Sequence, residues 1–309
     1  MDSAPLCHWD EVEAVAIDRG ELRGEHRRLG VGAGAVQVGC SRYRLEAGTR
    51  AMPVHVHADE EEIFFVLAGS GLSWQDGATF AVAAGDCLVH LVNGPAHTLI
   101  AGDDGLDVLA FAGGSQTNLT WLPRAGAWWA GPRWLPHDGP SPFAAEVAAG
   151  PLEVPAAQAV RPSTIVALGE VDAAPFGRGD VSGRWRDVGR AAGSQRSGLQ
   201  HVTVAAGALH APPHCHSAEE ELFVVLDGDG ILLLGEDEHP VRAGHVVARP
   251  AGTGIAHAFR AGAHGLTLLA YGQRDPNDMT FYPRSQKVAL RGLGVLFRVQ
   301  ALESWDGAE

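Results

Sequence analysis

The sequence predicts an all-β protein made of two tandem domains of the same fold. The stretch "HVHADEEEIFFVLAGSG" at 55–71 returns as "HCHSAEEELFVVLDGDG" at 214–230, an offset of 159 residues. The apolar runs are short, rich in β-branched and aromatic residues, and end at glycines, as strands do. The 309-residue chain also contains 40 glycines and 18 prolines, which suit many short elements joined by turns.

The repeat extends beyond the quoted stretch. At the same offset glycines match along most of the two halves, in the pairs Gly20/Gly179, Gly24/Gly183, Gly30/Gly189, Gly48/Gly207, Gly69/Gly228 and Gly71/Gly230. After one inserted residue the offset becomes 160, and His97 matches His257. Because turn glycines are selected by positive φ or close backbone approach, this agreement indicates a shared backbone. Together with the chain length it predicts two domains, 1–150 and 151–309, joined where prolines and glycines cluster.

Strands are the main elements expected in each copy. The unbroken apolar runs at 63–69 and 222–228 predict strands buried on both faces, and the runs at 241–252 and 264–272 continue the pattern with turns between them. Helical turns are expected only at 12–17 and 144–149. The outer faces of the apolar strands must be covered by the other domain, an N-terminal arm or a second subunit, and a homodimer is predicted.

Composition excludes several classes of partner. The chain has 37 acidic and 23 basic residues and a formal net charge of -14, whereas nucleic acid and anionic membranes need a basic surface. No run approaches the ~18 apolar residues of a membrane span. The four cysteines form no CxxC pair, and the first residues lack the apolar core of a signal peptide. These features predict a cytoplasmic protein.

Two histidines one residue apart open each repeated stretch and predict a metal site. Residues i and i+2 of a strand point to the same side, so the two imidazoles of each pair converge, while the residue between them faces away. A glutamate follows after four residues, and a later strand supplies a third histidine. Three neutral nitrogens and a carboxylate suit a first-row divalent metal. The predicted ligands are His55, His57, Glu62 and His97 in the first half and His214, His216, Glu221 and His257 in the second.

These motifs resemble those of the cupin superfamily. The first cupin motif, glycine, HxH, four residues, glutamate and a later glycine, is met by Gly207–Gly228 and by Gly48–Gly69. The second motif is matched by Gly244, Pro250, Gly252 and His257, whereas the first copy keeps Gly85 and "GPAH" but lacks the earlier proline. The resemblance implies a bicupin with two double-stranded β-helix (jelly-roll) barrels. The chain is similar to bicupins of unassigned function. The implied cofactor is a divalent ion of Mn, Fe, Ni, Cu or Zn, with up to two ions per chain.

Other polar and aromatic residues receive less specific interpretations. The additional glutamates are expected to be solvated turn residues: Glu60, Glu61, Glu219 and Glu220. Five histidines are expected to be ordinary loop or core residues: His90, His210, His239, His245 and His264. Cys215, between two predicted ligands, is expected to be a packed thiol. The tryptophans are expected to pack the first domain against its partner: Trp121, Trp128, Trp129 and Trp134. Candidates for holding an anionic substrate are Arg50, Arg249 and Arg260.

Two classes of function remain open at this point. The resemblance favours an enzyme acting on a small organic substrate, of the dioxygenase type, with a metal-dependent decarboxylase, isomerase or lyase as the alternative. The other class is a non-catalytic cupin that binds a small molecule. Binding-only cupins tend to lose metal ligands, and this chain keeps all eight, which favours the enzyme. The catalytic residues, the substrate and the working copy are not assigned.

Overall fold

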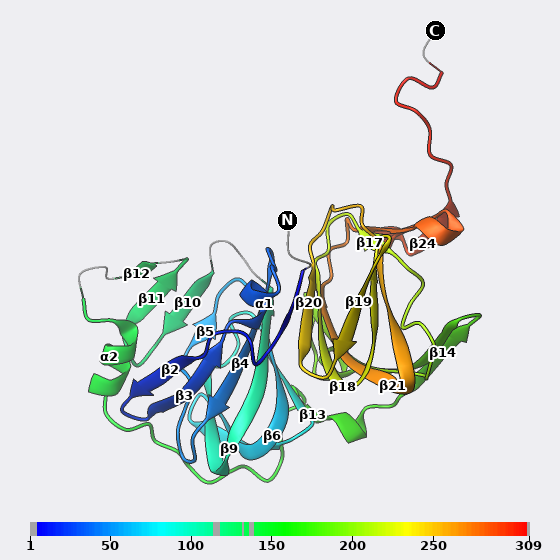
Figure 1. The fold of residues 1–309 in the computed structure, drawn as a ribbon. Helices are drawn as coiled ribbons and strands as arrows, with labels where there is room; N and C mark the ends of the chain where they lie inside the picture. Colours follow the sequence, from blue (N-terminus) through cyan, green and yellow to red (C-terminus); the bar gives the residue numbers. More distant parts are fainter. Residues whose placement is uncertain (1–4, 114–117, 132, 136–138, 308–309) are drawn as a thin grey trace.

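The computed structural model describes residues 5–113, 118–131, 133–135 and 139–307 and shows two similar halves built from strands (Figure 1). The first half contains an eight-stranded sheet, comprising β13 (Ile165–Ala167), β8 (Asp86–His90), β6 (Glu62–Gln75), β9 (His97–Gly113), β4 (Val38–Leu45), β3 (Leu22–Arg27) and β2 (Val15–Arg19) in that order, with β7 (Ala78–Ala83) on β6. A four-stranded sheet accompanies it: β12 (Arg133–Leu135), β11 (Ala127–Ala130), β10 (Leu119–Leu122) and β5 (Val56–His57).

The second half repeats this plan. Its eight-stranded sheet comprises β1 (Leu6–His8), β20 (His245–Arg249), β18 (Glu221–Leu234), β21 (His257–Gln273), β16 (Ser197–Val204), β15 (Val181–Asp187) and β14 (Ala174–Arg178), with β19 (Asp237–Arg242) on β18. The smaller sheet is β17 (Cys215–His216), β22 (Met279–Tyr282), β23 (Lys287–Leu290) and β24 (Val295–Arg298). The prediction of an all-β protein with two tandem domains of one fold is confirmed.

Helices are few and short. They are α1 (Leu29–Gly32), α2 (Pro142–Ala148), α3 (Val188–Ala191) and the 3₁₀ turns η1 (Leu168–Glu170), η2 (Pro283–Ser285) and η3 (Arg291–Leu293). The helix expected near 144–149 is confirmed by α2, but the one expected at 12–17 is wrong. Val15–Arg19 instead pairs with Leu22–Arg27 as a hairpin, because the sheet offers that segment an edge. Among the described residues, no helix combines the length and hydropathy that crossing a membrane requires.

The strands at the centre of each half are buried on both faces, as their unbroken apolar runs predict. In β6, Phe64 and Val66 point into the first barrel, while Ile63 and Phe65 join a core shared by both halves. The second half contributes the equivalent residues of β18 to that core, and Phe111 stacks on Tyr271 across it at 5.2 Å. The other half of the same chain therefore covers the outer faces.

Each half also lends one short strand to the other. β1 lies at the N-terminus but pairs with β20 of the second half, and β13 comes after the first half yet pairs with β8 of that half. Figure 1 shows β1 running alongside β20. The two strands are equivalent by the repeat offset, since Leu6 corresponds to Ile165. The segment before β13 also lies on the first half, where Trp74 donates a hydrogen bond to the Glu153 carbonyl.

The tryptophans do not pack one half against the other, so that prediction is wrong. Trp121 and Trp128 face each other across β10 and β11, and Trp128 and Trp129 are more than a third exposed. The strands carrying them belong to the small sheet, which lies on the side of the first half away from the second (Figure 1). The side chain of Trp134 falls outside the described residues.

The repeated glycine pair Gly69 and Gly228 occupies positions where a side chain cannot fit. Gly69 has a φ of 81°, and a Cβ there would lie 2.2 Å from the Gly105 carbonyl oxygen. Gly228 has a φ of 79° and an equivalent contact of 2.3 Å with Gly265. Irregular strand pairing around these glycines accompanies the bends in β6 and β18.

Substitution of Gly69 should therefore lower the free energy of unfolding much more than substitution of a glycine that has a positive φ but open space where its side chain would lie. Gly34 has a φ of 79°, and a Cβ added there would have no heavy atom within 4 Å, so it is a matched control. We expect Gly34→Ala to lower the free energy of unfolding by about 1–2 kcal/mol, and Gly69→Ala by about 4 kcal/mol or more because the clash is added. Equal losses in chemical denaturation would contradict this assignment.

Candidate metal centres

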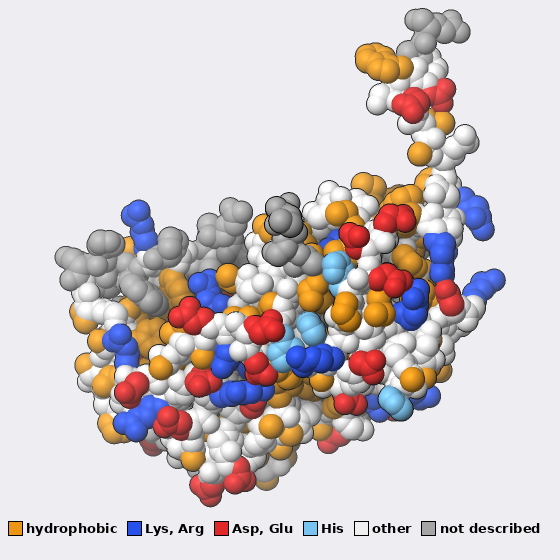
Figure 2. Space-filling model, in the orientation of Figure 1, with side chains coloured by type: hydrophobic (Ala, Val, Ile, Leu, Met, Phe, Trp, Pro, Cys, Tyr) orange, Lys and Arg blue, Asp and Glu red, His pale blue; other side chains and the backbone are white. Residues whose placement is uncertain are grey.

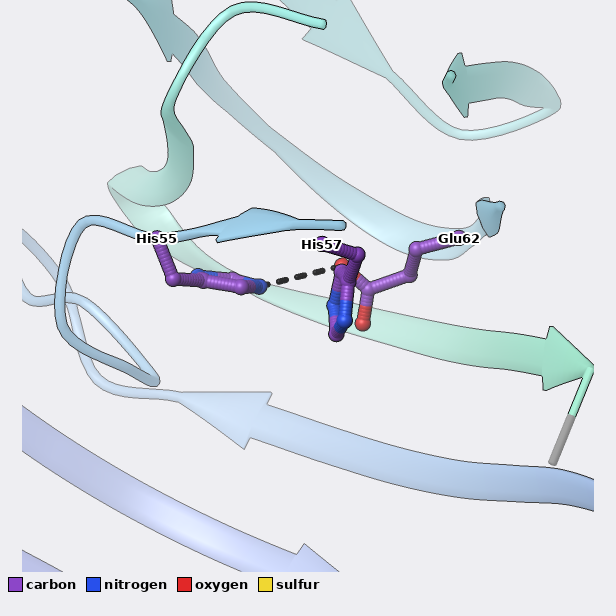
Figure 3. Close-up of side chains that lie close together, drawn as sticks. All are labelled: His55, His57 and Glu62. Carbon is purple, nitrogen blue, oxygen red and sulfur yellow. Dashed lines mark hydrogen bonds and ion pairs between the residues drawn. The ribbon is translucent and has the colours of Figure 1, made fainter. Parts of the chain in front are cut away.

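The four predicted ligands of the first half meet in the barrel interior. His57 lies on β5, Glu62 begins β6 and His97 begins β9, while His55 is joined to His97 by an isolated bridge. The Nε2 atoms of His55, His57 and His97 lie 3.2, 3.6 and 3.1 Å from one oxygen, Oε2 of Glu62. Figure 3 shows the imidazole of His55 directed at the Glu62 carboxylate, with His57 beside it.

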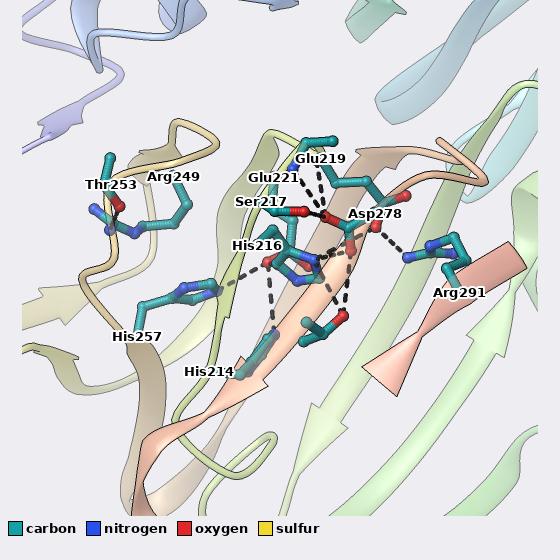
Figure 4. Close-up of polar contacts among 12 residues, drawn as sticks. His214, His216, Ser217, Glu219, Glu221, Arg249, Thr253, His257, Asp278 and Arg291 are labelled. Atoms are coloured by element: carbon teal, nitrogen blue, oxygen red, sulfur yellow. Dashed lines mark hydrogen bonds and ion pairs between the residues drawn. The ribbon is translucent and has the colours of Figure 1, made fainter. Parts of the chain in front are cut away.

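The second half repeats this cluster. The Nε2 atoms of His214, His216 and His257 lie 3.7, 3.2 and 2.9 Å from Oε2 of Glu221 (Figure 4). In both halves the two histidines of each pair converge, as their i, i+2 spacing predicts. Cys215, between its two histidines, is buried with a free thiol outside the cluster, and burial raises its pKa.

Hydrogen bonds at the far side of the rings fix which nitrogen faces the cluster. Nδ1 of His55, His97 and His214 donates to the carbonyl oxygens of Pro53, Pro95 and Pro212, respectively, at 2.8–3.1 Å. A carbonyl can only accept, so Nδ1 carries the hydrogen and a neutral ring presents the Nε2 lone pair to the cluster. That lone pair faces a carboxylate oxygen about 3 Å away, which is unfavourable unless a cation lies between them.

Several cluster atoms also lack another partner. Nε2 of His57, His216 and His257 and Oε2 of Glu221 are buried without a hydrogen bond within the described part of the chain. Buried polar atoms are normally satisfied. The donor set, the lone-pair directions and these unsatisfied atoms fit a divalent metal in each barrel, with nitrogen and oxygen ligands.

The electrostatics of the two carboxylates are alike. Burial would raise the pKa of Glu62, but its close contacts with the imidazoles of His55, His57 and His97 outweigh that effect and hold the pKa well below its usual range. Glu221 is held low in the same way. Burial and the neighbouring histidine charge lower the pKa of His97 to about 4, so this ring is neutral at physiological pH. Neutral imidazoles and ionised carboxylates are the forms that bind metals.

The surroundings of the two clusters differ. Nδ1 of His216 donates to the Asp278 carboxylate at 2.7 Å, whereas Nδ1 of His57 lies 3.1 Å from the Thr120 hydroxyl. Asn118 occupies the position equivalent to Asp278, and it accepts from Thr120. Burial lowers the pKa of His216, but Glu221 and Asp278 outweigh that effect and raise it to about 9. A carboxylate behind a ligating histidine increases the basicity of the ring.

The additional glutamates are not solvated turn residues; all four are buried, at 5% exposure or less. Glu60 lies 3.3 Å from Nδ1 of His57, and Glu219 lies 3.6 Å from Nδ1 of His216 and pairs with Arg291. Burial raises the pKa of Glu219 to about 7, although Arg291 opposes the shift.

Glu61 and Glu220 reach into the opposite half. The Glu220 carboxylate accepts hydrogen bonds from the backbone N–H groups of Val36, Gln37 and Val38. Glu61 accepts from the equivalent N–H groups of Gln195, Arg196 and Ser197 and from two serine hydroxyls. We refer to Glu61 and Glu220, with these amide groups, as the reciprocal carboxylate clasps.

Sequence reasoning also missed residues beside the clusters. Asp278 is the main one, and comparing the copies at the offset of 160 would have exposed the Asn118/Asp278 difference.

Of the histidines assigned to loops or core, His90 stacks on His97 with ring centroids 3.6 Å apart, and His210 lies beside His257. Of the three arginines expected as candidates for holding an anionic substrate, Arg50 pairs with Glu146 and Glu21. Arg260 is exposed and pairs with Glu238. Arg249 is therefore the remaining candidate next to a cluster.

Comparison with known families agrees with this geometry. The model described as "Cupin domain" matches residues 41–105 and again residues 200–268. The chain is a bicupin, with one cupin domain in each half. No curated protein sequence matches this bicupin.

Solved structures resemble the bicupin over most of its length. Oxalate decarboxylase from Lactobacillus farciminis, in a formate complex, aligns with a TM-score of 0.62 and 18% identity, covering 92% of this chain and 89% of that one. Oxalate decarboxylase from Bacillus subtilis at pH 4.6 aligns with a TM-score of 0.59 and 17% identity, covering 88% and 76%. A further Bacillus subtilis oxalate decarboxylase structure, concerned with its Mn(II) centres, aligns with a TM-score of 0.58 and 17% identity, covering 88% and 77%. At these identities the likeness establishes the fold.

Proposed function

We propose that this bicupin is a metal-dependent enzyme that decarboxylates, or otherwise cleaves without net oxidation, a small organic acid. The observation that carries the proposal is the convergence of three Nε2 atoms on one carboxylate oxygen, twice, with no other partner for several of these atoms in the described chain. Structural histidines in a core are satisfied by ordinary hydrogen bonds. Here the ordinary hydrogen bonds are formed by Nδ1, on the side of the ring away from the cluster. The Nε2 lone pair is therefore left for a metal.

Similar structures favour the decarboxylase alternative over the dioxygenase. The similar structures described above, which align with both barrels, are oxalate decarboxylases, and they give no support to the dioxygenase expected from sequence. Mn²⁺ is the preferred metal in this proposal, because one neighbour contains Mn(II) centres and the histidine–carboxylate set accepts that ion. Iron, nickel, copper and zinc are the alternatives for the same ligands.

The eight converging residues would hold the metals: His55, His57, Glu62 and His97 in the first barrel, and His214, His216, Glu221 and His257 in the second. A bound divalent metal supplies a Lewis acid that stabilises negative charge on a substrate oxygen. The chain itself fixes five of the six rings through Nδ1 contacts, those of His55, His57, His97, His214 and His216, and Asp278 increases the electron donation of His216. Apolar side chains such as Phe223, whose ring lies 5.5 Å from His257, exclude water from the reacting groups.

Other sequence-based assignments remain predictions. The binding of a small-molecule substrate is part of the proposal. A homodimer and a cytoplasmic location stay predictions, and the covering of the apolar strands by the other half removes one reason for the dimer. Figure 2 shows acidic and basic side chains interspersed on one face of the molecule, without a broad basic patch among the described residues of that face.

Product analysis on metal-loaded protein tests the proposed reaction. Protein reconstituted with Mn²⁺ would be incubated with a panel of small mono- and dicarboxylic acids while CO₂ release and O₂ consumption are measured together. We expect CO₂ release without stoichiometric O₂ consumption, and its loss in His214→Ala/His216→Ala. Stoichiometric O₂ consumption would support the dioxygenase instead, and binding without turnover of any acid would support a non-catalytic cupin.

A further inference from the structure

Arg249 is a buried guanidinium without a carboxylate partner in the described part of the chain. Three arginines there are less than 9% exposed, namely Arg42, Arg50 and Arg249. Arg42 forms a two-pronged pair with Asp107, and Arg50 pairs with Glu146 and Glu21. Arg249, at 5% exposure, instead donates to the Ile255 carbonyl at 3.0 Å and lies 3.5 Å from the Thr253 hydroxyl, and its Nε has no partner. Guanidinium stays charged at neutral pH, so this burial is unfavourable unless an anion completes the site.

The position of Arg249 places it beside the second metal centre. It ends β20, directly opposite Glu221 in the strand register, and both side chains lie on the inner face of the sheet. The Glu221 carboxylate is directed at the three histidines and is therefore not available to Arg249 (Figure 4). The segment that Arg249 contacts, 253–255, is exposed and leads into His257. The guanidinium is directed at this segment (Figure 4), and its charge acts on the second centre, where burial and, to a smaller extent, Arg249 lower the pKa of His257 to about 4.

The first barrel lacks this arrangement in its described residues. The residue opposite Glu62 is His90, whose ring stacks on His97 and provides no permanent charge. Two further positions change from apolar to polar between the copies: Ala51 corresponds to His210, and Leu122 corresponds to Tyr282, which stacks on His214 at 5.7 Å. The Glu221 side chain is 21% exposed, compared with 9% for Glu62. The second centre is thus the more open and the more polar of the two.

We propose that Arg249 is the specificity-determining residue of the enzyme, pairing with a substrate carboxylate and confining anion binding to the second barrel. This inference rests on the proposed function for the identity of the ligand as a substrate, although not for the binding of an anion. The planar guanidinium matches a carboxylate with two parallel hydrogen bonds, which lysine cannot reproduce. His90 cannot replace it, so the first barrel holds its metal without selecting an anionic substrate.

Thermal unfolding with formate as the probe tests the assignment, using metal-loaded protein and sodium chloride at equal ionic strength as the reference. Formate should raise the melting temperature of the wild type. Arg249→Met should raise the apparent Kd for formate by about tenfold or more, because a charge-assisted hydrogen bond to the anion is lost. Arg249→Lys should recover only part of the affinity. Arg42→Met, the matched buried but paired arginine, should keep the formate response within about twofold of the wild type.

Stability without formate gives a second readout, because the two buried arginines differ in having a carboxylate partner. Arg42→Met should lower the melting temperature, because it leaves Asp107 with only the longer 3.4 Å contact to the half-exposed Arg44, whereas Arg249→Met should leave the melting temperature unchanged or raise it. An equal fall in both variants, or an undiminished formate response in Arg249→Met, would overturn the assignment. Arg249-dependent formate binding without turnover of any acid would sink the proposed function and leave this inference standing. Turnover with an unchanged KM in Arg249→Met would overturn this inference and leave the proposed function standing.

Discussion

The His214→Ala/His216→Ala variant should retain one equivalent of bound metal where the wild type binds two. Two of the four predicted ligands of the second centre are removed, and Glu221 with His257 alone cannot retain a first-row metal against dialysis. The first centre shares no ligand with the second, so its metal should remain. His55→Ala/His57→Ala should give the converse loss. Metal content by mass spectrometry on purified, reconstituted protein measures both.

A control separates ligand loss from a general effect of removing histidines. His264 is exposed and lies outside both clusters, so His264→Ala should keep two equivalents. Loss of both metals in either double variant would show that the two centres are not independent. Absence of metal from the reconstituted wild type would remove the basis of the enzymatic proposal.

Glu220→Ala should lower the free energy of unfolding by about 3–5 kcal/mol, a loss comparable to breaking a buried ion pair. The substitution removes the acceptor of three backbone N–H groups, those of Val36, Gln37 and Val38, in a place where the glutamate is 0% exposed. The Val38 N–H group is buried and the other two are partly buried, and a buried donor left without a partner costs about 1–3 kcal/mol. Glu61→Ala should be comparably destabilising, since its carboxylate accepts equivalent hydrogen bonds from the other half.

Chemical denaturation followed by circular dichroism measures these losses. The exposed Glu46 provides the control, and Glu46→Ala should change stability by no more than about 0.5 kcal/mol. A loss below about 1 kcal/mol in Glu220→Ala would mean that water replaces the carboxylate, and that the reciprocal carboxylate clasps do not hold the halves together.

Local periodicity was sufficient to predict the strands and the converging histidines. The alternation of side chains in a strand places His214 and His216 on one side whatever the rest of the chain does, and the duplicated spacing adds Glu221. The unbroken run at 222–228 indicated burial on both faces, which the shared core between the halves explains. These features depend on residues close in sequence, so the sequence carries them directly.

Features that depend on distant partners were not predictable in this way. Glu220 looked like a turn residue because its acceptor role depends on N–H groups 182 to 184 residues earlier in the chain. Arg249 could be suggested as an anion-binding residue, but only its surroundings distinguish it from Arg50 and Arg260. The same holds for Asp278, whose role depends on its 2.7 Å contact with His216. Comparing the two copies position by position is the one sequence signal that would have drawn attention to these residues.

The exchange of β1 and β13 between the two halves indicates how the chain evolved. Each barrel contains one strand encoded outside its own half, and the two crossings are equivalent under the internal repeat. This is the arrangement expected from an ancestral single-barrel chain that associated as a strand-swapped pair and was later fused end to end by gene duplication. A gene cut between codons 150 and 151 would therefore separate each barrel from one of its own strands. Co-expression of the two fragments, which restores both strands, is the way to rebuild the ancestral pair.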